Sequence, residues 1–260
     1  MYWLEFAGED DPFAALEATA AASDVAILAP GIGTATALAR DRAAELALTS
    51  AAGEVVGHTD ASVESARALL EAAGIDREGT VAVRARDVRS SATVDTQRAE
   101  RALGAVLTDR GYEVDLEDPD HTLRALFARG DLARDGAATA DAPLGIEASG
   151  RVAFAPDADG ADRCLLGWVD VEREAAFGSR APTDRPFFQP GSMDPALARA
   201  LVNLAGARPG ATVVDPMCGT GGLLLEGSLV GARSVGVDAQ EKMVRGTREN
   251  LAELAPDDAD

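Results

Sequence analysis

The sequence has 260 residues, enough for one large domain or for two to three small ones. Hydrophobic residues make up 47 % of it, so a sizeable core can form, and no apolar run reaches the ~18–20 residues that a membrane span requires. The net charge of −20 disfavours general binding to nucleic acid, so any RNA contact has to come from a local cluster of arginines.

The basic residues are almost all arginine: Lys242 is the single lysine, so 23 of the 24 basic residues are arginine, against 44 acidic residues. Such acidic, lysine-poor chains are typical of salt-loving archaea, where molar salt shortens the Debye length to ~3 Å and weakens repulsion between carboxylates. An ordinary acidic protein from a GC-rich genome is the alternative. Cys164 and Cys218 form neither a disulfide framework nor a zinc pattern, and His58 and His121 lack ligand spacing, so we expect no metal site. The N-terminus lacks a basic region followed by an apolar segment, and a cytoplasmic location is expected.

Residues 1–75 alternate short apolar runs with alanine-rich stretches, which predicts a small α+β unit. We expect strands at 2–6 and 25–29, and helices at 12–22, 35–48 and 62–73. The run from Val25 to Gly33 places Gly-x-Gly after a strand, but Pro30 interrupts it and no third glycine follows at the required spacing. We interpret this run as a tight turn.

Residues 76–170 are expected to form a second α+β unit. The pattern predicts strands at 80–86, 112–116, 122–128 and 164–171, a helix at 95–108, and a loop over 131–149. The candidate RNA-binding residues of this unit are Arg84, Arg86, Arg89, Arg98 and Arg101. Residues 80–101 contain five arginines and three acidic residues, so their local net charge is +2. Arginine both pairs with phosphates and stacks on bases. A solvated helix or strand face is the alternative.

Residues 171–190 are expected to be a linker, because the stretch 181–186 has two prolines and no periodicity. From residue 191 to 260 the pattern predicts helices at 196–205, 223–230 and 241–251, with a buried strand at 211–215 and a second strand at 233–238. This β-α-β-α order is the opening of a doubly wound, Rossmann-like sheet. The expected fold class is therefore α+β followed by α/β.

The glycine-rich run Asp215-Pro216-Met217-Cys218-Gly219-Thr220-Gly221-Gly222 follows the first of these strands, and Asp238 ends the second. An anionic Asp215 is badly placed to bind the pyrophosphate of a dinucleotide. It is well placed for S-adenosylmethionine, which carries a sulfonium and an ammonium group and no phosphate. Gly219 and Gly221 would let the backbone approach this cofactor, and Asp238 would accept hydrogen bonds from both ribose hydroxyls. A purely structural strand–turn–helix is the alternative.

The run Arg185-Pro186-Phe187-Phe188-Gln189-Pro190-Gly191-Ser192-Met193-Asp194-Pro195, together with the Asp215 loop, resembles archaeal tRNA guanine-10 N2-methyltransferases. The resemblance is close over residues 185–251. In that family a THUMP-containing RNA-binding half precedes a Rossmann-like methyltransferase half. Residues 76–170 are similar to a THUMP domain, and residues 1–75 match the general layout of a ferredoxin-like α+β region.

The resemblance implies transfer of one or two methyl groups from S-adenosylmethionine to the exocyclic N2 of guanine 10 in tRNA. It also implies that residues 187–195 cover the methionine end of the cofactor, although the Phe187–Phe188 pair has a simple hydrophobic anchor as its alternative. The expected cofactor-binding residues are Phe188, Pro190, Asp215, Pro216, Gly219, Thr220, Gly221 and Asp238. Cys218 is interpreted as a packed small residue.

One departure from the family pattern concerns catalysis. Methyltransferases of this kind resemble one another in an Asp-Pro-Pro-Tyr loop after the fourth strand, and no Pro-Pro pair occurs in this chain. The chain stops at Asp260 after two strands of the expected sheet, so we expect a fragment of a longer protein with no catalytic residues of its own. Such a sheet should leave Val213, Val214, Val235 and Val237 partly uncovered.

Two other functions are weighed against this one. A THUMP-bearing thiolation enzyme would need an ATP pyrophosphatase loop, and the Asp215 loop argues against it. A non-catalytic THUMP-type RNA-binding protein with a degenerate methyltransferase half is the main alternative. The oligomeric state is not predicted.

Overall fold

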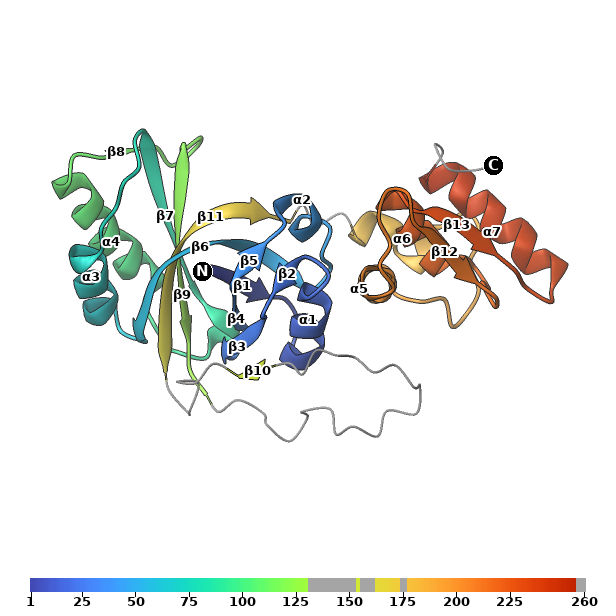
Figure 1. The fold of residues 1–260 in the computed structure, drawn as a ribbon, viewed down its shortest axis with the longest axis horizontal. Helices are drawn as coiled ribbons and strands as arrows, with labels where there is room; N and C mark the ends of the chain where they lie inside the picture. Colours follow the sequence, from blue (N-terminus) through green and yellow to red (C-terminus); the bar gives the residue numbers. More distant parts are fainter. Residues whose placement is uncertain (131–152, 155–161, 174–176, 256–260) are drawn as a thin grey trace. The chain divides into compact units, whose positions relative to one another are not determined.

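The computed structural model describes residues 1–130, 153–154, 162–173 and 177–255 (Figure 1). The chain divides into two compact units. The N-terminal unit comprises Met1–Ala43 and Thr49–Glu172, and the C-terminal unit comprises Ala44–Leu48 and Arg173–Asp260. The loop expected over 131–149 lies outside the described residues. Of the helices described, none is both long and apolar enough to cross a membrane.

A mixed β-sheet is the framework of the N-terminal unit. Within the described residues it has nine strands in the order β10-β3-β4-β1-β6-β11-β9-β7-β8. These strands are β1 (Tyr2–Phe6), β3 (Ala26–Ala29), β4 (Ile32–Ala35), β6 (Thr49–Asp60), β7 (Thr80–Asp87), β8 (Glu113–Val114), β9 (His121–Ala128), β10 (Ala153–Phe154) and β11 (Arg163–Glu172). Strand β7 runs parallel to β8 and β9, β10 runs parallel to β3, and the other neighbours are antiparallel. The regions expected at 1–75 and 76–170 thus contribute strands to one sheet.

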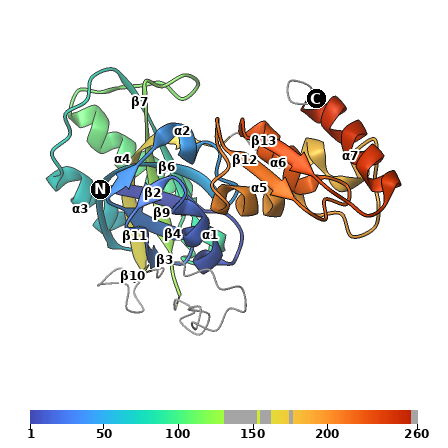
Figure 2. The same ribbon diagram turned by 45° about the vertical axis from the view of Figure 1, so that its right-hand side comes forward.

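Two helices, α3 (Val63–Ala72) and α4 (Thr96–Asp109), cover one face of this sheet and lie side by side in both views (Figures 1 and 2). Ser62 and Asp95 cap them, since each side chain accepts a backbone N–H three residues on. Their apolar stripes pack with alternate residues of β7, β9 and β11 into a core that includes Leu103, Phe127 and Trp168.

Most of the expected elements are present, and α4, β7, β9 and β11 match closely. The helix expected over 35–48 is wrong, because that stretch holds the end of β4, the short strand β5 (Ala37–Leu38) and only one helical turn, α2 (Arg40–Ala43). The helix expected over 12–22 ends early: α1 spans Asp11–Ala18, and β2 (Ala22–Ser23) then pairs with β5. In both places pairing with other strands overrides the helix propensity of alanine.

Two further differences concern strands of the N-terminal unit. The pattern missed the 12-residue strand β6, whose alanines and glycines have low strand propensity. The strand expected over 112–116 is only β8, because the carboxylate of Asp115 accepts the N–H groups of Glu117 and Asp118 and starts a turn. The same two N–H groups lower the pKa of Asp115.

The C-terminal unit contains all the expected helices and strands. Their bounds are α5 (Pro195–Leu204), β12 (Thr212–Asp215), α6 (Gly222–Leu229), β13 (Arg233–Gly236) and α7 (Glu241–Leu254). Strands β12 and β13 are parallel, and α6 packs on both strands and on α5. The linker expected at 171–190 contains the end of β11 and two short 3₁₀ turns, η3 (Phe177–Arg180) and η4 (Pro182–Asp184).

Strand β12 is not buried on both faces. Val213 packs beside a small cluster that contains Val202 and Val230, whereas Val214 on the other face is 62 % exposed. Val235 and Val237 are also exposed, at 39 % and 56 %. The expectation that these valines would be partly uncovered is confirmed, and the expectation of a buried strand over 211–215 is wrong for Val214.

The centre of the sheet leaves no room for a side chain at Gly53 of β6. A Cβ atom there would lie 1.8 Å from the backbone oxygen of Trp168. We predict that Gly53→Ala lowers the free energy of unfolding by about 3 kcal/mol, the upper end of typical overpacking costs, because a backbone atom cannot swing aside. The matched control is Gly74→Ala, which meets nothing within 4 Å and should change stability by less than about 0.5 kcal/mol. Denaturant unfolding measures both, and equal stabilities would contradict the strand pairing.

Candidate cofactor-binding site

The glycine loop joins the end of β12 to the start of α6. Gly219 and Gly221 have φ angles of +52° and +79°, a region that residues with a Cβ rarely adopt. Gly221 is the N-cap of α6 and offers no side chain to the first turn. Among the described residues no side chain accepts from the first N–H groups of α6, so these groups can bind a polar ligand at the positive end of the helix.

Two carboxylates flank this loop at the ends of adjacent parallel strands. Asp215 closes β12, and one of its oxygens accepts the N–H of Met217 at 3.0 Å. Asp238 follows β13, and its oxygens accept the N–H groups of Gly219 and Gln240 at 3.0 and 2.9 Å. A carboxylate oxygen has two lone pairs, so both acids shape the loop and can still accept hydrogen bonds from a ligand.

Two side chains of helix α7 donate hydrogen bonds to backbone carbonyls of the glycine loop. The hydroxyl of Thr247 donates to the carbonyl of Gly219 at 2.8 Å, and Asn250 Nδ2 donates to the carbonyl of Thr220 at 2.9 Å. Both side chains are almost fully buried, at 4 % and 1 % exposure. The sequence analysis missed these two residues. Their signal is a pair of polar residues three positions apart on one helix face, which is easily confused with the solvent side of α7.

Asn250 also fixes the segment that precedes α5. Its amide exchanges two hydrogen bonds with the backbone of Phe187, at 2.8 and 2.9 Å. A second link joins the hydroxyl of Thr220, which donates to the hydroxyl of Ser192, 3.0 Å away. Residues 187–195, called the covering segment after their expected role, and the glycine loop are therefore held by the same side chains.

The two adjacent phenylalanines have different positions. The ring of Phe187 lies so close to α7 that a Cβ on Gly246 would sit 2.0 Å from it, so Phe187 is a hydrophobic anchor. Phe188 is 41 % exposed, and Pro190 and Pro216 are exposed as well. Of the pair, Phe188 is the one available to a ligand.

Cys218 is buried beneath the loop, with its sulfur 3.9 Å from the hydroxyl of Thr247. Burial raises the pKa of its thiol, and the negative charges of Asp215 and Asp238 raise it further. A thiol with a raised pKa is a poor nucleophile at neutral pH, so the geometry matches a packed small residue.

The structure does not gather the five candidate RNA-binding arginines into one free patch. Arg86 pairs with the buried Glu5 at 3.0 Å, Arg89 pairs with Asp11 at 2.5 Å, and Arg98 pairs with Glu64 at 2.5 Å. Arg84 donates to the carbonyl of Leu116 at 2.6 Å. Arg101 on α4 is exposed and has no polar contact among the described residues.

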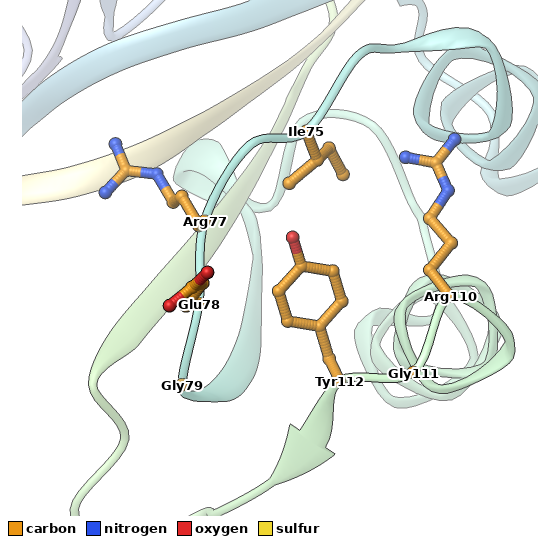
Figure 3. Close-up of a pocket in the computed structure, with 7 residues that line it drawn as sticks. All are labelled: Ile75, Arg77, Glu78, Gly79, Arg110, Gly111 and Tyr112. Carbon is orange, nitrogen blue, oxygen red and sulfur yellow. The ribbon is translucent and has the colours of Figure 1, made fainter.

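A separate hollow of about 580 Å³ lies between the end of α4 and the start of β7. Its lining is Ile75, Arg77, Glu78, Gly79, Arg110, Gly111 and Tyr112 (Figure 3). Both guanidinium groups point away from the Tyr112 ring: Arg77 pairs with Glu54 at 2.7 Å, and Arg110 donates to the carbonyls of Glu71 and Ala73. The arginines of this hollow are therefore engaged in holding the fold.

Comparison with known proteins identifies both parts of the chain. Residues 182–259 match the RMKL-like methyltransferase domain, and residues 60–130 match the THUMP domain. The chain therefore combines a part similar to the THUMP domain with a part similar to a methyltransferase domain. The glycine loop and the covering segment both lie within the methyltransferase match, and α3, α4, β7 and β9 lie within the THUMP match.

Two curated tRNA methyltransferases are similar to this chain in sequence. The chain is 35 % identical over 209 residues to the tRNA (guanine(10)-N2)-dimethyltransferase of Methanothermobacter thermautotrophicus, covering 79 % of this chain and 52 % of the relative. It is 49 % identical over 85 residues to the protein of that name from Methanocaldococcus jannaschii, covering 33 % and 24 %. The crystal structure of TrmN from Thermus thermophilus aligns with a TM-score of 0.49 at 24 % identity, over 97 % of this chain and 70 % of that one. The chain spans about half the length of the first of these relatives.

The buried thiols give a test of this site in solution. We predict that Cys218 reacts with iodoacetamide more slowly than a free cysteine at every pH up to its raised pKa, because less of it is thiolate. Peptide mapping by mass spectrometry follows Cys218 and the fully buried Cys164 separately. Alkylation of Cys218 at the rate of an unfolded peptide would place it outside the packed loop.

Proposed function

We propose that this chain is part of an S-adenosylmethionine-dependent tRNA methyltransferase that modifies the exocyclic N2 of guanine 10. The observation that carries the proposal is the pair of carboxylates, Asp215 and Asp238, on either side of a glycine loop that leads into an uncapped helix. The named relatives support the substrate, and the THUMP match supports tRNA as the partner, in a cytoplasmic setting.

Each part of the loop has a role in this proposal. The cofactor binds across the ends of β12 and β13, with its ribose hydroxyls donating to Asp238. Its amino-acid end approaches Gly219, Thr220 and Gly221, where the φ angles of the glycines bring backbone rather than side chains to the ligand. Its carboxylate is drawn to the free N–H groups at the start of α6, and its ammonium and sulfonium groups are drawn to Asp215.

The covering segment closes the methionine end of the cofactor. Phe188 and Pro190 are its exposed apolar residues, and Pro216 is exposed in the facing loop. Apolar contact on this side excludes water from the sulfonium methyl and leaves it accessible to the incoming amine. The exocyclic nitrogen of guanine is a weak nucleophile because its lone pair is delocalised into the ring, so alignment of nitrogen, methyl carbon and sulfur is the main contribution required of the protein.

The cofactor is tested first. Asp238→Ala should weaken binding of S-adenosylmethionine by about 1–3 kcal/mol, because the ribose hydroxyls lose their acceptor. Glu241→Ala, three residues later in the exposed first turn of α7, is the matched control and should leave the affinity unchanged. Calorimetry in molar KCl measures both. No binding by the unmodified chain, or equal binding by the Asp238 variant, would remove this site from the proposal.

The RNA partner is tested on α4, because Arg98 and Arg101 can be replaced without unpairing the buried acids Glu5 and Asp11. If both contact phosphates, Arg98→Ala with Arg101→Ala should weaken tRNA binding and lower the slope of log affinity against log salt by about 2. Affinity for S-adenosylmethionine should stay the same. An unchanged salt slope would make this helix face a solvated surface.

The reaction is tested by nucleoside analysis. Unmodified tRNA incubated with the complete protein and methyl-labelled S-adenosylmethionine should carry label as N2-methylguanosine or N2,N2-dimethylguanosine at position 10. A guanine-10 substitution in the tRNA should abolish the label. Binding of tRNA and cofactor without methyl transfer would favour a non-catalytic RNA-binding protein.

A further inference from the structure

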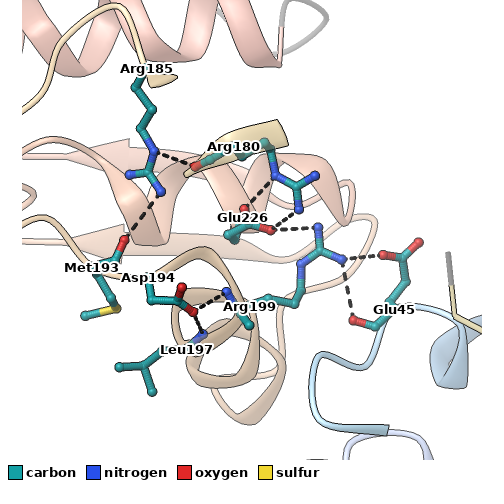
Figure 4. Close-up of polar contacts among 9 residues, drawn as sticks. Glu45, Arg180, Arg185, Met193, Asp194, Leu197, Arg199 and Glu226 are labelled. Atoms are coloured by element: carbon teal, nitrogen blue, oxygen red, sulfur yellow. Dashed lines mark hydrogen bonds and ion pairs between the residues drawn. The ribbon is translucent and has the colours of Figure 1, made fainter. Parts of the chain in front are cut away.

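A fully buried carboxylate lies in the helix that starts at the glycine loop. Glu226 of α6 has 0 % exposure and stands four residues, about one turn, after Gly222. Its oxygens pair with Arg180 at 2.9 and 3.1 Å and with Arg199 of α5 at 2.9 Å. Figure 4 shows these guanidinium groups meeting at Glu226. A charge buried in this way is tolerated only while its partners stay in place.

Arg199 has a second partner, which comes from far away in the sequence. Its Nη1 pairs with the carboxylate of Glu45 at 2.6 Å and approaches the Glu45 carbonyl at 3.4 Å. Asn203 Nδ2, one turn along α5, donates to the same carbonyl at 3.0 Å. Arg199 itself is only 6 % exposed, whereas the Glu45 side chain is 41 % exposed, so the buried guanidinium takes its second charge partner from a carboxylate at the surface.

Glu45 belongs to a short segment of chain that packs with the C-terminal unit. Residues Ala44–Leu48 are part of that unit, although the residues before and after them, up to Ala43 and from Thr49, belong to the N-terminal unit. Leu46 and Ala47 are each 1 % exposed, and Arg173 donates to the carbonyl of Ala47. Two of the five residues are almost fully buried, and the carbonyls of Glu45 and Ala47 accept hydrogen bonds from side chains of the C-terminal unit, so the segment is a fixed part of that unit.

The arginines around Glu226 also contact an aromatic ring. The ring of Phe177 faces the guanidinium groups of Arg173 and Arg180 at 5.3 Å and that of Arg199 at 5.9 Å. Guanidinium groups over a ring face are stabilised by the ring's quadrupole, which adds to the ion pairs. The methyltransferase match begins at residue 182 and includes neither Phe177, Arg180 nor Glu45.

We infer that residues Ala44–Leu48 are an integral piece of the methyltransferase unit, and that Glu45 is a positioning residue that sets helix α6 through Arg199 and Glu226. Since α6 carries the free N–H groups next to the glycine loop, its position determines how well the loop holds the cofactor. The link to cofactor affinity rests on the proposed function, whereas the link from Glu45 to α6 does not.

The test uses Glu45→Gln in the whole chain, which keeps the backbone contacts of Glu45 and removes its charge. Hydrogen exchange should become faster for the amides of Leu223–Leu229 in α6, while the amides of α7 keep their rates. Affinity for S-adenosylmethionine, measured well below the melting temperature, should fall roughly threefold or more. In an Arg199→Met background, Glu45→Gln should have no further effect on either quantity.

The matched control is Asp41→Asn, which removes one negative charge four residues earlier, from an exposed side chain with no polar contact in the described part of the chain. It should change neither quantity. The inference is overturned if Glu45→Gln leaves α6 exchange unchanged, if α7 speeds up equally, or if Asp41→Asn has the same effect. If the unmodified chain binds no cofactor, the proposed function fails, and α6 exchange alone still decides the role of Glu45.

Discussion

A glycine loop has few side chains of its own, so the atoms that hold it must come from other parts of the chain. Asp238 fixes the N–H of Gly219, Thr247 fixes its carbonyl, and Asn250 fixes the carbonyl of Thr220. Asn250 also binds both backbone groups of Phe187. The side-chain amide of Asn250 therefore fixes the positions of both the glycine loop and the segment proposed to cover it. A ligand between them meets a surface whose shape is fixed before it arrives, which reduces the cost of binding.

The sequence allowed the fold to be predicted where a single local pattern dominates. Helix α4 and strand β7 have clear periodicity, and Asp215 and the glycines of the loop lie in one contiguous motif. The stretch over 35–48 and strand β6 could not be predicted, because alanine and glycine have low strand propensity. Pairing with strands that are distant in the sequence decides the structure of these two stretches. Asn250 and Thr247 were missed for a related reason. A polar residue on a helix is normally predicted to be exposed, and the sequence does not show that a polar backbone loop packs against this helix face.

The local net charge of a sequence also does not show which arginines are free in the folded protein. The excess of arginine between residues 80 and 101 suggested a free basic patch, yet Arg86, Arg89 and Arg98 each lie against a carboxylate from another part of the chain. With 44 acidic and 24 basic residues, most arginines can find an acidic partner in the folded state. Glu5 shows the cost of this arrangement, since burial raises its pKa in spite of Arg124 and Arg86. Of the five candidate arginines, Arg101 on α4 is the exposed one without a polar contact among the described residues.

Helix α6 is subject both to the need to support the glycine loop and to the cost of burying charge. Its N-terminus must stay uncapped if it is to meet a ligand, so the helix cannot be fixed at that end by its own first turn. The position of α6 is fixed one turn later, by Glu226 between Arg180 and Arg199. An apolar residue at 226 would avoid the cost of burying a charge, but hydrophobic packing tolerates small sliding movements. Ion pairs of 2.9–3.1 Å tolerate much less, so a buried charge here gives α6 a single position and keeps the open end of the helix aligned with the glycine loop.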